Sequence, residues 1–257
     1  MYKMKTLVTL ALVCFVIHAG AQVKKPVVKP ASPIVKKPTT LKAPVKKNTT
    51  VKKTTPVVKK EVKLPGTRVK VTTDSGVMVI RLYDKTPLHR DNFIKLANEH
   101  FFDSLIFHRV ISEFMIQGGD PQSKNAQPGQ MLGAGDIGYT IPAEFDTALF
   151  HKKGALAAAR TENPAKASSG CQFYIVQGKT WTDADLNNME MQRSVKYSLA
   201  QRKMYKTIGG TPFLDMGYTV FGEVESGLNV IDKIASVPKA PGDRPIADVR
   251  MKIEVIK

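Results

Sequence analysis

The sequence is poor in cysteine and tryptophan, and it lacks an apolar run long enough to cross a membrane. Its 257 residues include only Cys14, Cys171 and Trp181 of these two kinds. The apolar stretch at residues 7–17 is too short for a spanning helix, which needs about 20 apolar residues. Two cysteines at most could form one disulfide, so the fold must be stabilised mainly by packing.

Patterns for metal binding and covalent catalysis are also missing. The histidines of the C-terminal two thirds are scattered without the paired spacing of a zinc site: His89, His100, His108 and His151. Residues 168–171 read SSGC, but no matched base accompanies this segment. We therefore expect no metal, no cofactor and no covalent intermediate.

The first 21 residues have the three parts of a secretory signal peptide. Lys3 and Lys5 precede the apolar stretch, and Ala19-Gly20-Ala21 forms a small-residue cleavage site before Gln22. We expect cleavage there and export to the periplasm or cell envelope; an uncleaved anchor is the alternative. The cleaved chain would keep Cys171 as its single cysteine and have no internal disulfide.

Residues 22–66 form a biased segment with 13 Lys, 7 Pro and a single Glu. Proline favours extended backbone and like charges repel, so we predict a semi-stiff disordered tether. It supplies +12 of the net charge of +17, and Lys3 and Lys5 supply +2, which leaves +3 for residues 67–257. The tether is either a soluble spacer or a weak contact to anionic envelope polymers. No aromatic residues interleave with the lysines, so nucleic-acid binding is not expected.

The folded part begins near Thr67 and reads as short strands with few helices. Alternating apolar residues on both sides of residues 74–76 predict a β-hairpin. Thr86-Pro87 predicts the start of a helix over residues 87–99 that buries Phe93 and Leu96. A second helix is expected at residues 226–235 with Ser226 as its cap. The remaining short apolar runs predict an all-β barrel or sandwich.

Three segments, FHRVISEFMIQGGD, CQFYIV and LDMGYTVFGEV, resemble the cyclophilin family of peptidyl-prolyl cis/trans isomerases. The resemblance covers residues 67–257 with one interruption. It implies a closed eight-stranded antiparallel barrel capped by two helices, acting as a monomer on proline-containing polypeptides. Isomerisation needs no covalent step, because the enzyme has only to favour the twisted imide over a barrier of about 18–20 kcal/mol.

The first segment supplies the candidate catalytic group. A guanidinium stays charged and carries several donors, so Arg109 is the candidate that stabilises the twisted imide, and we expect it to be held dry. Phe114, Met115 and Leu214 would form the apolar slot for the proline ring, and Gln117 would orient the substrate backbone. Residues 118–119 predict a tight glycine turn that Asp120 braces.

The resemblance implies further substrate-binding positions, some with departures from the family. Ala159 and Gln172 match, whereas Arg160 stands where many members have asparagine. Tyr174 replaces a frequent phenylalanine and adds a hydroxyl that needs a partner. Phe213 and Tyr218 stand where eukaryotic members often have tryptophan and histidine, so strong cyclosporin binding is not expected.

Residues 180–211 interrupt the resemblance. Thr182 and Asp185 resemble a capping box, and loosely periodic apolar residues predict a helix over residues 183–206 that is either continuous or broken once. We expect this insert beside the substrate groove, either as a wall or lid that selects client proteins or as a packing element only. The sequence as a whole predicts an exported isomerase that assists folding of exported proteins. A non-catalytic peptide-binding or chaperone-like scaffold is the alternative.

Overall fold

The computed structural model describes residues 65–256. The expected signal peptide, and all but the last two residues of the expected tether, lie outside the described residues. Within the described part, no helix combines the length and the hydropathy that crossing a bilayer requires.

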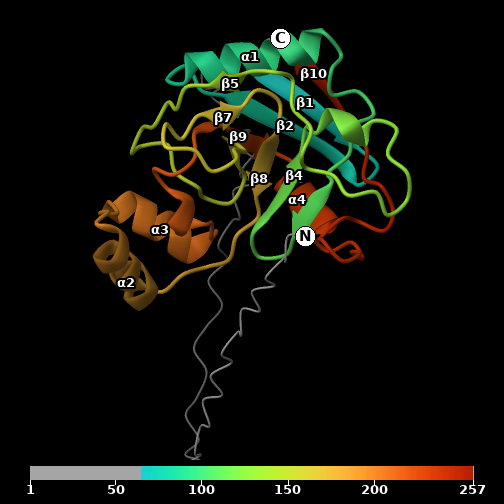
Figure 1. The fold of residues 1–257 in the computed structure, drawn as a ribbon. Helices are drawn as coiled ribbons and strands as arrows, with labels where there is room; N and C mark the ends of the chain where they lie inside the picture. The colour runs from blue at the N-terminus through green and yellow to red at the C-terminus, as the bar shows by residue number, and fades with distance from the viewer. Residues whose placement is uncertain (1–64, 257) are drawn as a thin grey trace, which may run out of the picture. The chain divides into compact units, whose positions relative to one another are not determined.

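Eight strands form one antiparallel sheet in the order β10-β1-β2-β9-β6-β8-β4-β3 (Figure 1). The strands are β1 (Arg68–Thr73), β2 (Gly76–Leu82), β3 (Arg109–Ile111), β4 (Met115–Gly118), β6 (Ala155–Ala158), β8 (Phe173–Val176), β9 (Val220–Ser226) and β10 (Met251–Ile256). β1 and β2 form the predicted hairpin, in which Thr73 pairs with Gly76. A separate two-stranded sheet pairs β5 (Thr140–Ile141) with β7 (Ser168–Ser169).

The sheet is open, so the expectation of a closed barrel is wrong. Its edge strands, β10 and β3, are not paired with each other as strands. The chain before β3 bonds instead to the residues around the start of β10. Phe107 N donates to Val249 O at 3.0 Å, and Met251 N donates to Leu105 O at 2.8 Å. Within β3, Val110 N donates to Asp243 O at 2.8 Å. The Val110 amide of β3 thus bonds to the loop before β10 and not to β10 itself. The sheet therefore ends as a curled half-barrel.

Four α-helices occur in the described residues, where two were expected to cap the barrel. Two of them, α1 (Pro87–Asn98) and α4 (Leu228–Ala235), pack against opposite parts of the sheet (Figure 1). The other two, α2 (Asp183–Arg193) and α3 (Leu199–Thr207), form the insert. Phe93 and Leu96 of α1 are buried as predicted.

The helix starts differ from the predicted caps. Thr86 makes no capping bond with its side chain; the carboxylate of Glu144 accepts from the backbone N–H groups of Leu88 and His89 at 3.1 and 3.0 Å. α4 begins after Gly227, and the predicted cap Ser226 is the last residue of β9. Gly227 has a φ of 87°, and a Cβ there would lie 2.3 Å from Val77 O, so only glycine fits this junction.

The central strands are buried on both faces, which explains their unbroken apolar sequences. Phe173 and Ile175 of β8 point into the main core, which α1 and α4 also fill. Tyr174 and Val176 point to the other face, where a second cluster forms. Successive side chains of a strand alternate between faces, so one apolar run serves both clusters.

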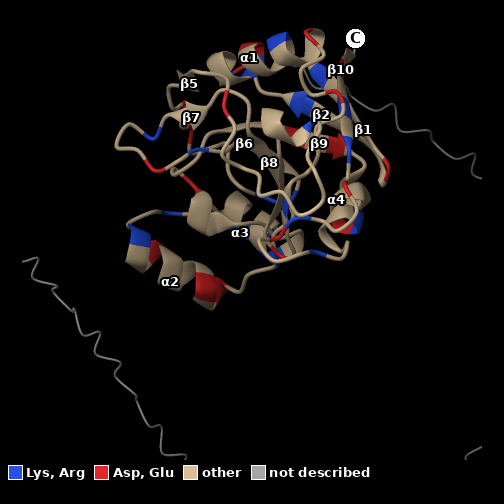
Figure 2. Cartoon of the chain, turned by 45° about the vertical axis from the view of Figure 1, so that its right-hand side comes forward, with Lys and Arg blue, Asp and Glu red and all other residues tan. Residues whose placement is uncertain are grey.

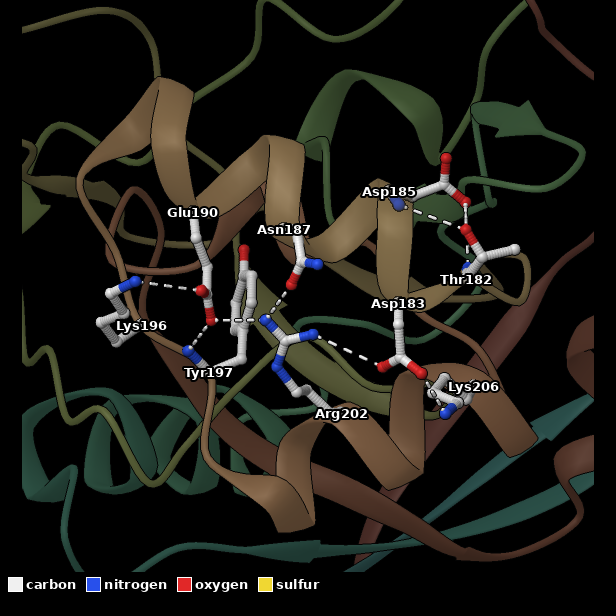
Figure 3. Close-up of polar contacts among 9 residues, drawn as sticks. All are labelled: Thr182, Asp183, Asp185, Asn187, Glu190, Lys196, Tyr197, Arg202 and Lys206. Atoms are coloured by element: carbon white, nitrogen blue, oxygen red, sulfur yellow. Dashed lines mark hydrogen bonds and ion pairs between the residues drawn. The ribbon is translucent and has the colours of Figure 1, made fainter.

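The insert is a helical hairpin with its own apolar core. A set of ion pairs and hydrogen bonds around Arg202, the Arg202 clasp, joins its two helices (Figure 3). Leu186, Tyr197 and Tyr205 form the core. Arg202 on α3 reaches α2, where Nη2 lies 2.9 Å from Glu190 Oε1. The Tyr197 amide and the neighbouring cations lower the pKa of Glu190 to about 2, so the clasp stays charged at neutral pH. Of the two predicted forms of the helix, the structure has the one with a single break, between α2 and α3, and the Thr182–Asp185 capping box is confirmed.

Acidic and basic positions are interspersed over the helices and strands (Figure 2). This distribution agrees with the small net charge of about +3 that residues 67–257 carry. The large positive charge of the chain therefore belongs to the segment before the folded domain.

Candidate active site

A cavity of about 1340 Å³ opens on the outer face of β4 and β8. One half of the cavity has apolar walls, and the other half is enclosed by loops, which are described below. The apolar half is lined by Phe114, Met115, Ala159, Tyr174, Leu214 and Tyr218. Arg109, Gln117 and Arg160 line the same cavity. The structure thus brings together these predicted positions from four separate parts of the chain; their individual roles stay predictions.

The apolar half is a slot built on the second cluster of buried side chains. Met115 and Tyr174 come from β4 and β8 and are nearly fully buried. Phe114, Leu214 and Tyr218 are partly buried and stand around them. A hollow with an apolar floor and partly exposed walls suits a small apolar ring such as that of proline.

Arg109 lies at the border of the slot, at the start of edge strand β3. Its side chain is 45% exposed, so the expectation of a dry guanidinium is wrong for the protein without substrate. Nη1 donates to Gln117 Oε1 at 3.5 Å, and Nε lies 3.9 Å from Asp243 Oδ2. Both contacts are long and weak, so the guanidinium can turn to an incoming acceptor at small cost.

A chain of side-chain amides holds Gln117 in one orientation. Gln117 Nε2 donates to Gln172 Oε1 at 3.1 Å. The buried Gln172 then donates to Gly133 O and Gly135 O at 3.0 and 2.7 Å. Since two carbonyl acceptors fix which end of Gln172 is the NH₂ group, the oxygen of Gln117 must face Arg109.

The glycine turn after β4 is as tight as predicted. Gly119 has a φ of 92°, and a Cβ there would lie 2.2 Å from Cys171 O. Asp120 is fully buried; its carboxylate accepts from Gln122 N at 2.8 Å and from Gly133 N. Asp120 therefore anchors the loop whose carbonyls hold Gln172, which extends its predicted bracing role.

Arg160 has a definite structural role, which the sequence left open. Its Nε donates to Gly217 O at 3.0 Å, and its guanidinium lies over the Tyr218 ring at 4.7 Å from the centroid. These contacts hold Tyr218 at the border of the slot, and a cation over an aromatic face is favourable in itself.

Two predicted positions do not line the cavity. Gln172 acts through Gln117, as described above. Phe213 lies behind the slot, where its ring contacts Phe114 at 5.7 Å and Trp181 at 6.1 Å between centroids. No residue of the insert lines the cavity, so the expectation that it forms a direct wall or lid is not met.

Sequence reasoning missed the loop half of the cavity. Residues 126–134 and 240–248 supply its walls, and Arg244 joins them by donating to Gln127 O and Gln130 O at 3.0 and 2.7 Å. These loops carry no motif that would have identified them. The sequence did predict that the buried hydroxyl of Tyr174 needs a hydrogen-bond partner. This partner is His151, whose Nε2 lies 2.9 Å from the hydroxyl oxygen.

Two buried titratable groups near the cavity are held neutral. Burial lowers the pKa of His108 to about 4, and its two ring nitrogens have no hydrogen-bond partner in the described part of the chain. Burial also raises the pKa of the Cys171 thiol to about 11, so it is not a nucleophile at neutral pH. Residues 65–256 contain no group of three or more His, Cys, Asp or Glu side chains arranged to hold a metal ion.

Comparison with known proteins identifies the family. Residues 68–255 match the family model of cyclophilin type peptidyl-prolyl cis-trans isomerases. A putative peptidyl-prolyl cis-trans isomerase of Staphylococcus haemolyticus is 34% identical over 191 residues, covering 74% of this chain and 91% of that protein. A putative bifunctional phosphatase/peptidyl-prolyl cis-trans isomerase of Streptococcus pyogenes is 37% identical over 187 residues. That match covers 72% of this chain and only 37% of the streptococcal protein.

Solved structures show the same fold. A cyclophilin type isomerase of Cryptosporidium parvum superposes with a TM-score of 0.54 at 21% identity, covering 74% of this chain and 98% of that one. A second structure of that protein, determined in the presence of the dipeptide Ala-Pro, gives a TM-score of 0.53. The curled sheet, the slot and the family match together define a prolyl isomerase. The chain belongs to the cyclophilin-type peptidyl-prolyl cis-trans isomerase family.

Proposed function

We propose that this protein accelerates rotation about Xaa-Pro bonds in exported polypeptides, with Arg109 stabilising the twisted imide. The observation that supports this assignment is that Arg109 lines the same cavity as the apolar slot of Phe114, Met115 and Leu214. Similarity to a family whose Cryptosporidium parvum member was crystallised in the presence of Ala-Pro points to the same class of substrate.

The mechanism follows from what rotation does to the imide. As the bond twists, the nitrogen lone pair loses its overlap with the carbonyl and becomes a better acceptor. A cationic donor beside that nitrogen strengthens its hydrogen bond to it only in the twisted state, and this difference lowers the barrier. The slot holds the ring, Gln117 holds the flanking backbone, and Arg109 supplies the donor.

Because Arg109 is exposed in the protein without substrate, water must be excluded from its guanidinium when the substrate binds. A polypeptide lying across the cavity covers the guanidinium on the side that now faces solvent. Its weak contacts to Gln117 and Asp243 are then exchanged for contacts to the substrate. The electrostatic effect on the imide grows as water leaves, because the local dielectric falls.

The proposed location rests on the first 66 residues. A signal peptide at residues 1–21 directs export, and the lysine- and proline-rich segment spaces the domain from the envelope. The substrates would then be newly exported chains that still contain slow prolyl bonds. Fractionation of cells that produce the full chain tests the location, and recovery in the cytosol with residues 1–21 intact contradicts it.

The activity is tested by magnetisation-exchange NMR on an Ala-Pro peptide with the purified protein. We expect exchange between the cis and trans forms at catalytic protein concentrations. Binding of the peptide at the slot without faster exchange would favour the non-catalytic scaffold. Binding to another surface would contradict the assignment of the site.

A further inference from the structure

The insert contacts the segment that carries one wall of the slot. Three of its residues contact η2 (Pro212–Leu214) and the residue after it. Tyr197 Oη donates to Pro212 O at 3.0 Å, and the Trp181 ring lies 6.1 Å from that of Phe213. Tyr205 Oη donates to Asp215 Oδ2 at 2.5 Å. Leu214, which lines the slot, lies between these anchored neighbours.

A buried polar chain continues from Asp215 to the floor of the slot. Asp215 Oδ1 accepts from His151 N at 2.9 Å and lies 2.8 Å from His151 Nδ1. His151 Nε2 lies 2.9 Å from Tyr174 Oη. Tyr205, His151 and Tyr174 are at most 4% exposed, and Asp215 is 8% exposed. The chain therefore runs through the interior from the insert to the slot.

Hydrogen-bond capacity fixes the direction of this chain. The carboxylate of Asp215 only accepts hydrogen bonds, so the Tyr205 hydroxyl and Nδ1–H of His151 both donate to it. In the tautomer that keeps Nδ1–H on Asp215, Nε2 of His151 is an acceptor, to which the Tyr174 hydroxyl donates. Burial raises the pKa of both tyrosines above the ordinary value, so both remain donors. The hydroxyl of Tyr174 is thereby directed to His151 and not to a ligand.

The insert is rigid enough to transmit position. Its two helices share a core. Arg202 also joins them through Asp183 and Glu190, as Figure 3 shows. The junction after α3 is equally tight, because a Cβ on Gly210 would lie 2.2 Å from His151 O. A displacement of Tyr205 must therefore move Asp215 or break its bond.

We propose that Tyr205 is a positioning residue for the slot, acting through Asp215 and His151 on Tyr174 and through the anchored η2 segment on Leu214. The inference rests on the proposed function of this site. It gives the insert a task that needs no contact with substrate: it sets the width of the slot and so the affinity for the prolyl residue.

The decisive variant is Tyr205→Phe, which removes one hydroxyl and keeps the ring. We expect KM for an Ala-Pro peptide to rise about fivefold to tenfold, while kcat changes less than twofold. Thr182→Ala is the matched control, because it removes the cap of α2 and lowers the melting temperature without touching Asp215. Its KM should stay within twofold of the unmodified protein.

A double variant separates positioning from general loosening. The route through Asp215 and His151 ends at the hydroxyl of Tyr174, which Tyr174→Phe removes. Adding Tyr205→Phe to Tyr174→Phe should therefore raise KM by a smaller factor than Tyr205→Phe does alone, and the remaining increase measures the route through Leu214. Equal KM shifts in Tyr205→Phe and Thr182→Ala, or additive shifts in the double variant, would overturn the proposal. Peptide Kd from NMR titration gives the same comparison if the protein binds without catalysing, so failure of the proposed activity is distinguishable.

Discussion

Arg109 and Gln117 are direct cross-strand partners in the β3–β4 pair, and Arg109 Nη1 lies 3.5 Å from Gln117 Oε1. This register places the candidate cation and the candidate backbone-orienting amide on the same face of the sheet, beside the slot. The amide chain through Gln172 turns the oxygen of Gln117 toward Arg109. The loops that hold Gln172 thus determine how the two polar groups meet a substrate.

Replacing Arg109 should remove most activity and leave the fold intact. We expect Arg109→Ala to lower kcat/KM by about 10²–10³-fold, since the donor to the twisted imide is lost. Arg90→Ala removes an arginine with only surface ion pairs and should keep full activity. Peptide isomerisation rates and thermal melts check both variants. Full activity in Arg109→Ala contradicts the mechanism, and unfolding would show that Arg109 is structural.

Gln172→Glu should disturb the amide chain from its buried end. A carboxylate cannot donate to Gly133 O and Gly135 O. In the variant these carbonyls therefore lose their donor and face a second acceptor. We expect a loss of about 1–3 kcal/mol in the free energy of unfolding and a higher KM. Gln192→Glu makes the same change at an exposed position of α2 and should do neither. Denaturant titrations give the free energy of unfolding of both variants, and isomerisation kinetics give their KM. Equal changes in the two variants would contradict a role of the amide chain from Gln172 to Gln117.

Stability should fall in mild acid because of His108. Its pKa is about 4 in the folded protein, below the ordinary value of 6.5, so the unfolded chain binds the proton more readily. The free energy of unfolding is then unaffected above pH 6.5 and decreases as the pH falls from 6.5 to 4, by about 3 kcal/mol. Burial also lowers the pKa of His89, which adds to the same trend.

The variant His108→Gln cannot titrate and should flatten part of this dependence. Urea denaturation at pH 7, 5.5 and 4.5 measures the slope for both proteins. An unchanged slope in the variant would show that His108 is not the group responsible.

Gly119→Ala should destabilise the protein strongly, because the new Cβ would lie 2.2 Å from Cys171 O at a φ of 92°. We expect a loss of at least about 2 kcal/mol in the free energy of unfolding. Gly129 has a φ of 75°, and no heavy atom lies within 4 Å of the place that a Cβ would take. Gly129→Ala should therefore cost only about 1 kcal/mol. Equal losses in thermal or chemical denaturation would exclude the steric explanation.

Cys171 should resist alkylation while the protein is folded. Its thiol is buried and its pKa is raised to about 11, so little thiolate exists at pH 8. Iodoacetamide treatment followed by mass mapping of the Cys171 peptide should show slow labelling that becomes rapid in denaturant. Fast labelling without denaturant would contradict this burial.

The strands and the slot residues were predictable because each rests on a short stretch of sequence. Apolar alternation identified the β1–β2 hairpin, and the apolar FYIV run of β8 indicated a further short strand. The FHRVISEFMIQGGD segment placed Arg109, Phe114, Met115 and Gln117 within one hairpin, so their proximity follows from local pairing. The Thr182–Asp185 capping box is equally local.

The remaining features depend on residues far apart in the chain. Glu144 caps α1 from 55 positions away, which no pattern around Thr86 could reveal. The sheet stays open because Val110 bonds to the loop at Asp243, and this choice is made between segments more than a hundred residues apart. The exposure of Arg109 could not be read from its apolar neighbours, because β3 lies at a sheet edge.

Sequence by itself determined the antiparallel β architecture, the family and the chemical groups available to the site, since these depend on local periodicity and motif order. Tertiary structure alone decided that Tyr205 of the insert bonds to Asp215, which also holds His151 beneath the slot. The physical reason is that a buried polar group takes whichever partner the packed chain brings within about 3 Å, and that partner is set by the fold.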